Sequence, residues 1–302
     1  MTNNLLLVTT IVALQFVNGY NNGMGKTPIM GFSSWYPVES NVTEAYMKQE
    51  CNALISTGLF KKGYISCNVD EGWLKNRSEN GTIIYDAIKF PSGMKALGNW
   101  AHQNGLMYGL YSSRGTVQCG SLGYHAPGSY GYYQQDANYM ADQGADYFKL
   151  DSCGGVGNMT DAFQQYQQFG QFLNQTGRPI YYDLCGWNWY YAINGGEYSN
   201  SWRTDGDDGS WSAMQNVFVT TMSGMWIHAK PYGWNNLDFL LSTNKGPQQA
   251  RFHVTEIQAR AQFSVYAAAS SDLVLIVSNR PILILLLSVF VIKYCCIYLD
   301  YI

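Results

Sequence analysis

The chain has 302 residues, of which 47% are hydrophobic, 15% are aromatic and only 13% are charged, and its net charge is −3. An average soluble domain carries about 25% charged residues. Intrinsic disorder is excluded, because disordered chains are rich in charge and poor in aromatic residues. No nucleic-acid partner is expected, because the charge balance leaves no basic stripe. The length is enough for one large domain or two small ones.

Apolar runs stand at both ends of the sequence. Residues 5–17 are typical of a secretory signal segment cleaved near Gly19, although a basic n-region is missing and a buried strand is the alternative. Residues 282–299 form a second run, interrupted by Lys293, which is either a membrane anchor or the product of a truncated or misread gene. We therefore expect a signal peptide at 1–19, a catalytic domain at 20–280 and a hydrophobic tail at 281–302. The 261 residues outside the signal and the tail match the roughly 250 residues of a (β/α)8 barrel.

Short β-rich runs alternate with helical patterns along the chain. Strands are predicted at residues 29–35, 64–70, 107–112, 146–151, 180–184 and 272–278, with further strand ends at 201–205 and around Trp234. Helices are predicted at residues 43–60, 91–104, 134–143, 160–174 and 248–269, and Gly105 and Gly144 act as stop signals. This alternation predicts a parallel sheet with right-handed crossovers, and about eight units favour a (β/α)8 TIM barrel over an open sheet. No Gly-X-Gly-X-X-Gly motif follows the first strand, which argues against a dinucleotide fold.

The carboxyl ends of the predicted strands carry acidic residues and tryptophans. The acids are Asp70, Glu71, Asp151, Asp205, Asp207, Asp208 and Asp238, and the tryptophans are Trp35, Trp73, Trp187, Trp202 and Trp234. Barrel enzymes hold their active sites at these ends. Carboxylates accept hydrogen bonds from sugar hydroxyls, indole faces pack on the C–H side of a pyranose, and two carboxylates are the minimum for glycoside hydrolysis. The pattern therefore predicts a sugar site.

Metal and cysteine chemistry is sparse. The four histidines do not cluster and no metal-ligand spacing is visible, so no metal or organic cofactor is expected. Two of the seven cysteines lie in the tail, and the other five cannot all pair with one another. Cys51 and Cys67 face each other across the first helix and the second strand, either as a disulfide or as buried thiols. Asn-X-Ser/Thr sequons, a weak sign of glycosylation, occur at Asn41, Asn76, Asn80, Asn158 and Asn174.

Seven short motifs in a fixed order resemble those of glycoside hydrolase family 27, the α-galactosidases and α-N-acetylgalactosaminidases. They are TPIMGFSSW (27–35), DEGW (70–73), FPSGMKAL (90–97), GLYS (109–112), YFKLDSC (147–153), NSWR (200–203) and GWNNLD (233–238). The resemblance implies a (β/α)8 barrel followed by a β-sandwich domain, and 302 residues leave no room for that second domain, which we expect to be absent.

The resemblance also assigns catalytic roles. Asp151 matches the nucleophile of the family and Asp207 matches the acid/base, whereas spacing alone does not choose among Asp205, Asp207 and Asp208. Lys149 precedes Asp151 by two residues, so both side chains leave the same face of the strand, and the cation favours the ionised carboxylate. Retention of configuration requires the two carboxyl groups to lie about 5–5.5 Å apart.

The remaining family contacts carry over residue by residue. The residues that match sugar contacts are Trp35, Asp70, Tyr111, Lys149, Arg203 and Asp238. Cys119 and Cys153 match a family disulfide beside the nucleophile, which would rigidify its loop.

Three positions depart from the family pattern. Glu71 and Gly72 stand where many members have Asp-Cys, and the partner of that cysteine is also missing near Ser40. The longer Glu71 would intrude on the 4- and 6-hydroxyls and so favour a pentopyranose. Gly186 stands where galactosidases have a Glu that reads the 2-hydroxyl, so Trp187 or Asn188 would substitute for it, or the space would admit an acetamido group. Asn236-Leu237-Asp238 replaces the usual Asp-Pro-Asp.

The sequence therefore predicts a retaining exo-glycosidase of the secretory route, extracellular or lysosomal/vacuolar, that acts on terminal α-D-galactosyl residues of oligosaccharides or glycoconjugates. A β-L-arabinopyranosidase and an α-N-acetylgalactosaminidase are alternatives on the same scaffold. An inactive sugar-binding protein is the alternative from another class. Membrane association is expected only if the tail is a true anchor.

Overall fold

The computed structural model describes residues 20–120, 125–241 and 254–276. The predicted signal segment, the predicted tail and the first part of the predicted helix at 248–269 lie outside these ranges. No helix within the described ranges combines the length and the apolar character needed to cross a bilayer.

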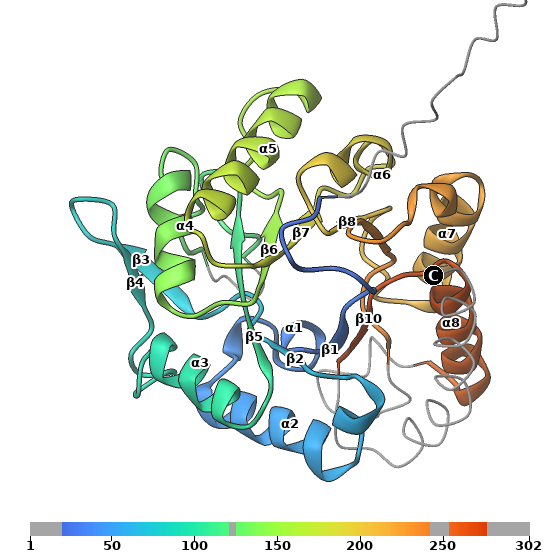
Figure 1. Cartoon of the computed structure of the whole chain (residues 1–302), viewed down its shortest axis with the longest axis horizontal. Coiled ribbons are helices and arrows are strands. Elements are labelled where there is room, and N and C mark those ends of the chain that lie inside the picture. Colours follow the sequence, from blue (N-terminus) through green and yellow to red (C-terminus); the bar gives the residue numbers. More distant parts are fainter. Residues whose placement is uncertain (1–19, 121–124, 242–253, 277–302) are drawn as a thin grey trace, which may run out of the picture.

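Eight parallel strands form one sheet at the centre of the molecule, in the order β10-β1-β2-β5-β6-β7-β8-β9 (Figure 1). The strands are β1 (Met30–Ser33), β2 (Ser66–Asn68), β5 (Met107–Ser113), β6 (Tyr147–Asp151), β7 (Tyr181–Cys185), β8 (Ser201–Arg203), β9 (Trp234–Asn236) and β10 (Leu273–Leu275). The first and last strands of this order, β10 and β9, meet at a bridge between Asn235 and Ser271. The predicted (β/α)8 barrel is confirmed.

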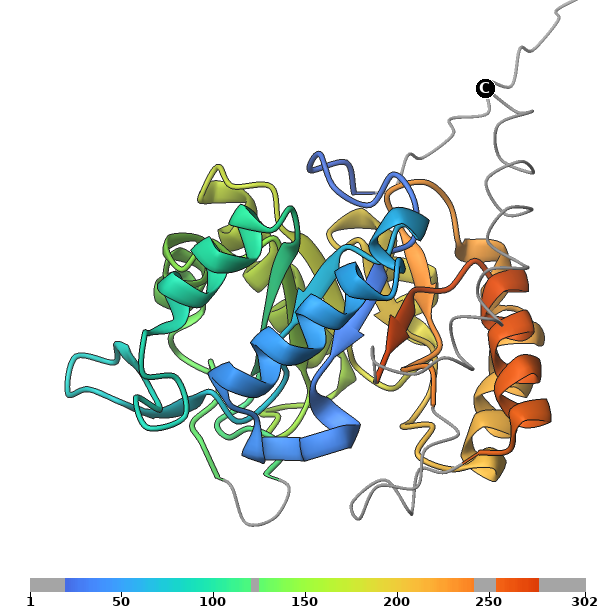
Figure 2. The same ribbon diagram turned by 90° about the horizontal axis from the view of Figure 1, so that it is seen from below.

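Helices cover the outside of this sheet (Figure 1). They are α2 (Glu44–Ser56), α3 (Met94–Gln103), α4 (Tyr133–Asp142), α5 (Met159–Gln175), α6 (Tyr190–Asn194), α7 (Trp211–Met222) and α8 (Glu256–Ala268). The single-turn helix α1 (Trp35–Val38) follows β1 directly and lies at the carboxyl edge instead. Short 3-10 turns lie at Glu39–Asn41, Phe60–Lys62, Gly195–Glu197 and Met225–His228. A hairpin of β3 (Leu74–Arg77) and β4 (Ile83–Tyr85), which the sequence reading missed, projects from one side of the barrel (Figure 2).

Local sequence signals set the helix ends. Asn158 and Asp161 form a capping box at the start of α5, so that two otherwise unpaired backbone N–H groups are satisfied. Gly105 and Gly144 follow α3 and α4 with φ of +76° and +82°, a conformation that glycine adopts without steric cost. Both predicted stop signals are therefore confirmed. The predicted start of the helix at residue 91 was wrong, because Pro91 lies in a turn closed by the Gly93 amide on the Phe90 carbonyl and α3 begins only at Met94.

The predicted first strand was also too long. It ends at Ser33, and Trp35 opens the single-turn helix α1 instead of standing at a strand end. This early bend turns the chain across the carboxyl edge of the sheet, where the acidic residues gather. The barrel thus places the ends of the strands, the loops after them and α1 on one face.

Candidate active site

Side chains from successive strands meet at the carboxyl edge of the barrel, where backbone dipoles and loop amides are available to hold charge. Asp70 follows β2, Tyr111 lies in β5, Lys149 and Asp151 lie in β6, Arg203 ends β8, and Asp238 follows β9. Of these, Asp70, Lys149, Asp151 and Asp238 are each 5% exposed or less. Buried charges are costly unless they are paired or hydrogen-bonded, so their partners decide what the site can do.

Asp151, the predicted nucleophile, is held by two donors. The Tyr111 hydroxyl donates to its Oδ2 at 2.9 Å and the Ser152 amide donates to its Oδ1 at 2.8 Å. Burial raises the pKa of Asp151 to about 6, with Lys149 and the two donors opposing that rise and Asp207 adding to it. The Lys149 cation acts in the predicted direction, because it lowers the pKa of Asp151, but burial has the larger effect and the net pKa is raised.

Lys149 pairs most closely with Asp70, not with Asp151. Its Nζ lies 3.1 Å from Asp70 Oδ2, which also accepts from the Ser33 hydroxyl at 3.3 Å. The ammonium stands over the rings of Tyr111 and Phe239, at 5.4 and 4.8 Å from their centroids. Burial lowers the pKa of Lys149, but the surrounding carboxylates, Asp70 first, hold it well above its usual value, so the lysine stays charged.

Glu71 is fully buried and points its carboxylate at the same cluster. Its Oε1 accepts from the Gly120 amide at 2.8 Å, and its Oε2 lies 3.5 Å from the Tyr111 hydroxyl. Burial raises the pKa of Glu71 to about 7, with the Gly120 amide and Lys149 opposing and Asp70 and Asp151 adding to the rise. The longer side chain therefore ends beside Tyr111, which itself contacts Asp151.

The three aspartates after β8, which spacing could not separate, have different environments. Asp208 is buried and accepts from the Tyr266 hydroxyl at 2.6 Å and from Gln262 at 2.7 Å. Asp205 accepts from the Thr220 hydroxyl at 2.6 Å and from the Gly206 amide. The Asp207 side chain is 57% exposed and its Oδ1 lies 3.1 Å from Arg203 Nη2. Arg203 also reaches the backbone carbonyl of Asp205, but of the three aspartates only Asp207 combines an exposed side chain with a carboxylate contact to this arginine.

Arg203 joins the two acids of this side. Its Nη1 lies 3.1 Å from Asp238 Oδ1, and its Nη2 reaches Asp207 and the backbone carbonyl of Gly206. Asp238 has a φ of +83°, which is strained for a residue with a side chain and is typical of functional positions. The Tyr36 hydroxyl donates to Asp238 at 2.6 Å. The sequence reading missed Tyr36, whose only signal was its place next to Trp35.

Asn236, which replaces the first Asp of the family's Asp-Pro-Asp, both accepts and donates a hydrogen bond. Its Oδ1 accepts from the Asp238 amide at 2.8 Å, and its Nδ2 donates to Asp183 Oδ2 at 2.9 Å. A carboxylate could accept but not donate, so the amide is suited to a position between a backbone amide and a buried acid.

Most of the predicted tryptophan platforms are core residues instead. Trp73, Trp202 and Trp234 are at most 1% exposed, and each indole N–H donates inside the protein. That part of the prediction was wrong, because burial of the large ring fills the barrel wall. Trp35 is half-buried and Trp187 is 36% exposed, so both indole rings have a free surface.

Two disulfides are present among the described cysteines. The predicted disulfide Cys119–Cys153 is confirmed. It ties the loop that contains Gly120 to Cys153, which lies two residues after Asp151. Cys51–Cys67, left open by the sequence, joins α2 to β2. Cys185 is free and buried, with its Sγ 3.5 Å from Arg203 Nη1.

The two missing family cysteine positions do lie side by side. A Cβ at Gly72 would stand 2.4 Å from the Ser40 carbonyl oxygen, and Gly72 has a φ of +116°. The Lys89 ammonium donates to both carbonyls, to Ser40 at 2.6 Å and to Gly72 at 3.2 Å. A charged hydrogen-bond bridge therefore joins the segments at this point.

Gly186 does not leave an empty space. A Cβ at this position would stand 2.1 Å from the Tyr191 ring, which is buried. The volume that a side chain would have occupied is therefore filled by Tyr191. The absence of the Glu does not by itself open room for an acetamido group in that direction.

Comparisons with known proteins agree with this geometry. The family model described as Alpha galactosidase A matches residues 34–286. An α-galactosidase of Cyamopsis tetragonoloba is 35% identical over 83% of this chain and 59% of its own, and α-galactosidase 2 of Arabidopsis thaliana is 34% identical over 88% and 66%. The structure of a Saccharomyces cerevisiae α-galactosidase with raffinose superposes with a TM-score of 0.82 at 28% identity, covering 92% of this chain and 66% of its own.

The chain thus spans between 59% and 66% of the length of these relatives. The family match nevertheless takes in every strand from β2 to β10 and all the acidic residues described above. The chain belongs to the α-galactosidase A family of glycoside hydrolases, family 27.

Proposed function

We propose that the protein is a retaining exo-glycosidase that hydrolyses terminal α-D-galactosyl residues. The observation that carries the proposal is the contrast between two carboxyl groups on one face of a barrel. Asp151 is buried and aimed by Tyr111 and Ser152, and the exposed Asp207 is close enough to raise its pKa. Glycoside hydrolysis needs such a pair, one group fixed against the sugar and one in exchange with water.

In the proposed first step, an Asp151 oxygen attacks the anomeric carbon and the bond to the leaving oxygen breaks. Asp207 gives its proton to that oxygen, so the leaving group departs as a neutral alcohol. In the second step Asp207 takes a proton from water, and the resulting hydroxide oxygen displaces Asp151 from the anomeric carbon. Two displacements restore the original configuration.

The other site residues have supporting roles in this proposal. Tyr111 holds the attacking oxygen, and Arg203 holds Asp207 in reach of the leaving group. Asp70, Lys149 and Asp238 offer charged groups to sugar hydroxyls, whereas Trp35 and Trp187 offer ring faces. No resident cofactor is required by these steps.

Glu71 favours a second candidate, a β-L-arabinopyranosidase. Its carboxylate lies 3.5 Å from the Tyr111 hydroxyl and so occupies space among the residues proposed to hold the sugar. A pentopyranose lacks the exocyclic carbon of galactose and needs less of that space. The filled space at Gly186 gives no such support to an α-N-acetylgalactosaminidase.

We place the protein in the secretory route, which the two disulfides support because they persist in oxidising compartments.

The test is hydrolysis of three 4-nitrophenyl glycosides, the α-galactoside, the β-L-arabinopyranoside and the α-N-acetylgalactosaminide, by the 302-residue chain. We expect the α-galactoside to be the best substrate, α-galactose to be the first product seen by proton NMR, and Asp151→Asn to lower kcat by about 10⁴-fold. Glu71→Asp should raise the preference for galactoside over arabinopyranoside. Binding of galactose without hydrolysis of any glycoside would instead identify an inactive sugar-binding protein, and a β-configured first product would exclude retention.

A further inference from the structure

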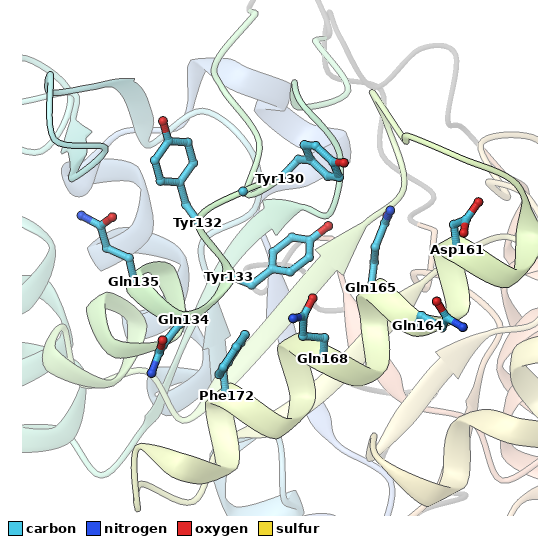
Figure 3. Close-up of a pocket in the computed structure, with 11 residues that line it drawn as sticks. Tyr130, Tyr132, Tyr133, Gln134, Gln135, Asp161, Gln164, Gln165, Gln168 and Phe172 are labelled. Carbon is cyan, nitrogen blue, oxygen red and sulfur yellow. The ribbon is translucent and has the colours of Figure 1, made fainter.

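A cavity of about 700 Å³ lies on the flank of the barrel between the start of α4 and the length of α5 (Figure 3). Tyr130 and Tyr132 stand in the segment before α4, and Gln164, Gln168 and Phe172 stand along α5. Neither Asp151 nor Asp207 lines it. Its volume is within the range of small-molecule sites, so the cavity is large enough for about one or two sugar rings.

Side-chain amides dominate the polar wall of this cavity. Its five glutamines are Gln134, Gln135, Gln164, Gln165 and Gln168. Two are engaged inside the protein, since Gln135 donates to Thr82 at 3.0 Å and Gln165 accepts from Arg114 at 2.5 Å. The other three are exposed and have no hydrogen-bond partner among the described residues. Each amide offers both a donor and an acceptor, which is the combination that a sugar hydroxyl requires.

Aromatic rings form the other part of the lining. Tyr130 is 42% exposed and Tyr132 is 38% exposed, and both stand at the rim in Figure 3. The Arg77 guanidinium stacks over the Tyr132 ring, 4.4 Å from its centroid. The Tyr130 ring packs edge-on against Tyr133, with the centroids 6.4 Å apart. Rings held in this way present apolar surface without a large loss of side-chain entropy.

Charge is nearly absent from the cavity. Asp161 is the only Asp, Glu, Lys, Arg or His among the residues that line it, and its Oδ2 accepts from the Asn158 amide at 2.8 Å in the capping box. A phosphate, a nucleotide or a charged peptide would find no free cation here to pair with. Free amides beside fixed tyrosine rings, without charge, are the chemistry that recognises a neutral carbohydrate.

Arg114 connects the cavity to the site of the carboxylates. Its Nη1 donates to Gln165 in the cavity wall, its Nε donates to Ser152, and its backbone amide donates to the carbonyl oxygen of Asp151. One residue therefore separates the two sites.

We propose that this cavity is an accessory binding site for a neutral polysaccharide or oligosaccharide, independent of the hydrolytic step. The site would hold the main chain of a branched substrate and raise the local concentration of its side groups at the carboxylates. It goes beyond the proposed hydrolysis, because binding at the cavity requires no bond to be broken.

The test is affinity electrophoresis of the 302-residue chain, freed of any N-glycans, in gels that contain a galactomannan or the same polymer stripped of its galactosyl side groups. The stripped polymer has no terminal galactose for the carboxylate site, so retardation by it reports the cavity. We expect wild-type protein to be retarded in both gels. Tyr130→Ala and Gln168→Ala should each weaken this binding about tenfold, as truncation of a central contact does.

Matched control variants distinguish a loss of polysaccharide binding at the cavity from a general loss of folded protein. Tyr130→Phe keeps the ring, and Gln171→Ala removes an exposed glutamine of α5 that does not line the cavity, so both should be retarded as wild type is. Thermal unfolding and the rate on 4-nitrophenyl α-galactoside should be unchanged in all four. The proposal is overturned if the stripped polymer does not retard the wild type, or if Tyr130→Ala and Gln168→Ala bind it unchanged. Loss of hydrolysis with retardation intact would count only against the proposed function.

Discussion

The two sides of the carboxylate site are built differently. On the Asp151 side, five residues of β5 pair with β6, and five residues of β6 pair with β7. On the Asp207 side, β8 and β9 are only three residues long. Asp151 is 5% exposed, whereas the Asp207 side chain is 57% exposed. One carboxyl group is therefore fixed by continuous sheet, whereas the other is carried by a loop in contact with water.

The largest loss of activity is expected at the two acids, and it tests whether Asp207 donates the proton while Asp151 attacks. Asp207→Asn should lower kcat/KM about 10³-fold on an unactivated α-galactosyl disaccharide, because the leaving oxygen then departs without a proton. On 2,4-dinitrophenyl α-galactoside, whose leaving group needs no proton, the loss in formation of the covalent intermediate should be less than about tenfold. The measurement is the pre-steady-state burst of dinitrophenolate.

Asp151→Asn is the comparison variant for this experiment. Because the attacking group is needed whatever the leaving group, it should lose a similar factor on both substrates. If Asp207→Asn also lost the same factor on both, the assignment of Asp207 as the proton donor would be wrong.

The two disulfides offer a second comparison, of intermediate size. They close loops with sequence separations of 34 (Cys119–Cys153) and 16 (Cys51–Cys67), so the double Cys→Ser variant at either should lose about 3–4 kcal/mol of unfolding free energy. Only the first should also lower kcat, by about tenfold, because Gly120 would no longer hold Glu71 beside Tyr111 and Asp151. Urea unfolding and initial rates check both effects.

Equal losses of kcat in the two double variants, measured well below their melting temperatures, would contradict this separation. An unchanged kcat in the Cys119/Cys153 variant would mean that the loop carrying Gly120 keeps its place without the covalent bond. Each variant serves as the control for the other.

The smallest expected effect is on the pH dependence. Because burial raises the pKa of Asp151 to about 6 and the attacking group must be ionised, kcat/KM should fall about tenfold per pH unit below pH 6. The Lys149 cation lowers this pKa, so Lys149→Met should move the acidic limb to higher pH. A limb that stayed in place would show that another group governs it.

The same pKa has a consequence for stability with the opposite sign. The folded pKa of Asp151 lies above its unfolded value, so the folded state binds more protons, and this contribution to stability is lost as pH rises from about 4 to 6. Asp151→Asn should therefore flatten the dependence of the melting temperature on pH in that range.

The barrel was predictable from the sequence because its signals are local. Alternation of β-rich runs with helical patterns, and glycines such as Gly105 after a helix, depend on neighbours along the chain. The hairpin β3–β4 was missed because its strands are mostly exposed or half-buried and β3 is largely polar, so it lacks the buried apolar run that marks the equally short strands of the barrel. The turn at Trp35 was missed because a single helical turn carries no pattern either.

That the acidic strand ends lie together was predictable, but their pairing was not. The residues at strand ends were identified, yet Lys149 pairs most closely with Asp70, and three predicted tryptophan platforms lie in the core. These outcomes depend on distances across the barrel, between residues as far apart in sequence as Tyr36 and Asp238. The separation of Asp207 from Asp208 likewise depends on Tyr266 and Gln262, which belong to the helix α8.

The junction of β9 with β10 gives the barrel a seam. In place of a ladder it has two isolated bridges, between Asn235 and Ser271 and between Leu240 and Leu275. Local opening costs the least free energy where few backbone hydrogen bonds must break, so the junction of β9 with β10 is a place where the barrel can open locally. Asp238 lies between β9 and β10 in the chain, so opening there would disturb its contact with Arg203, while β5, β6 and β7 keep Asp151 in register. The contact between Arg203 and Asp238 should therefore be lost on local opening before Asp151 is displaced.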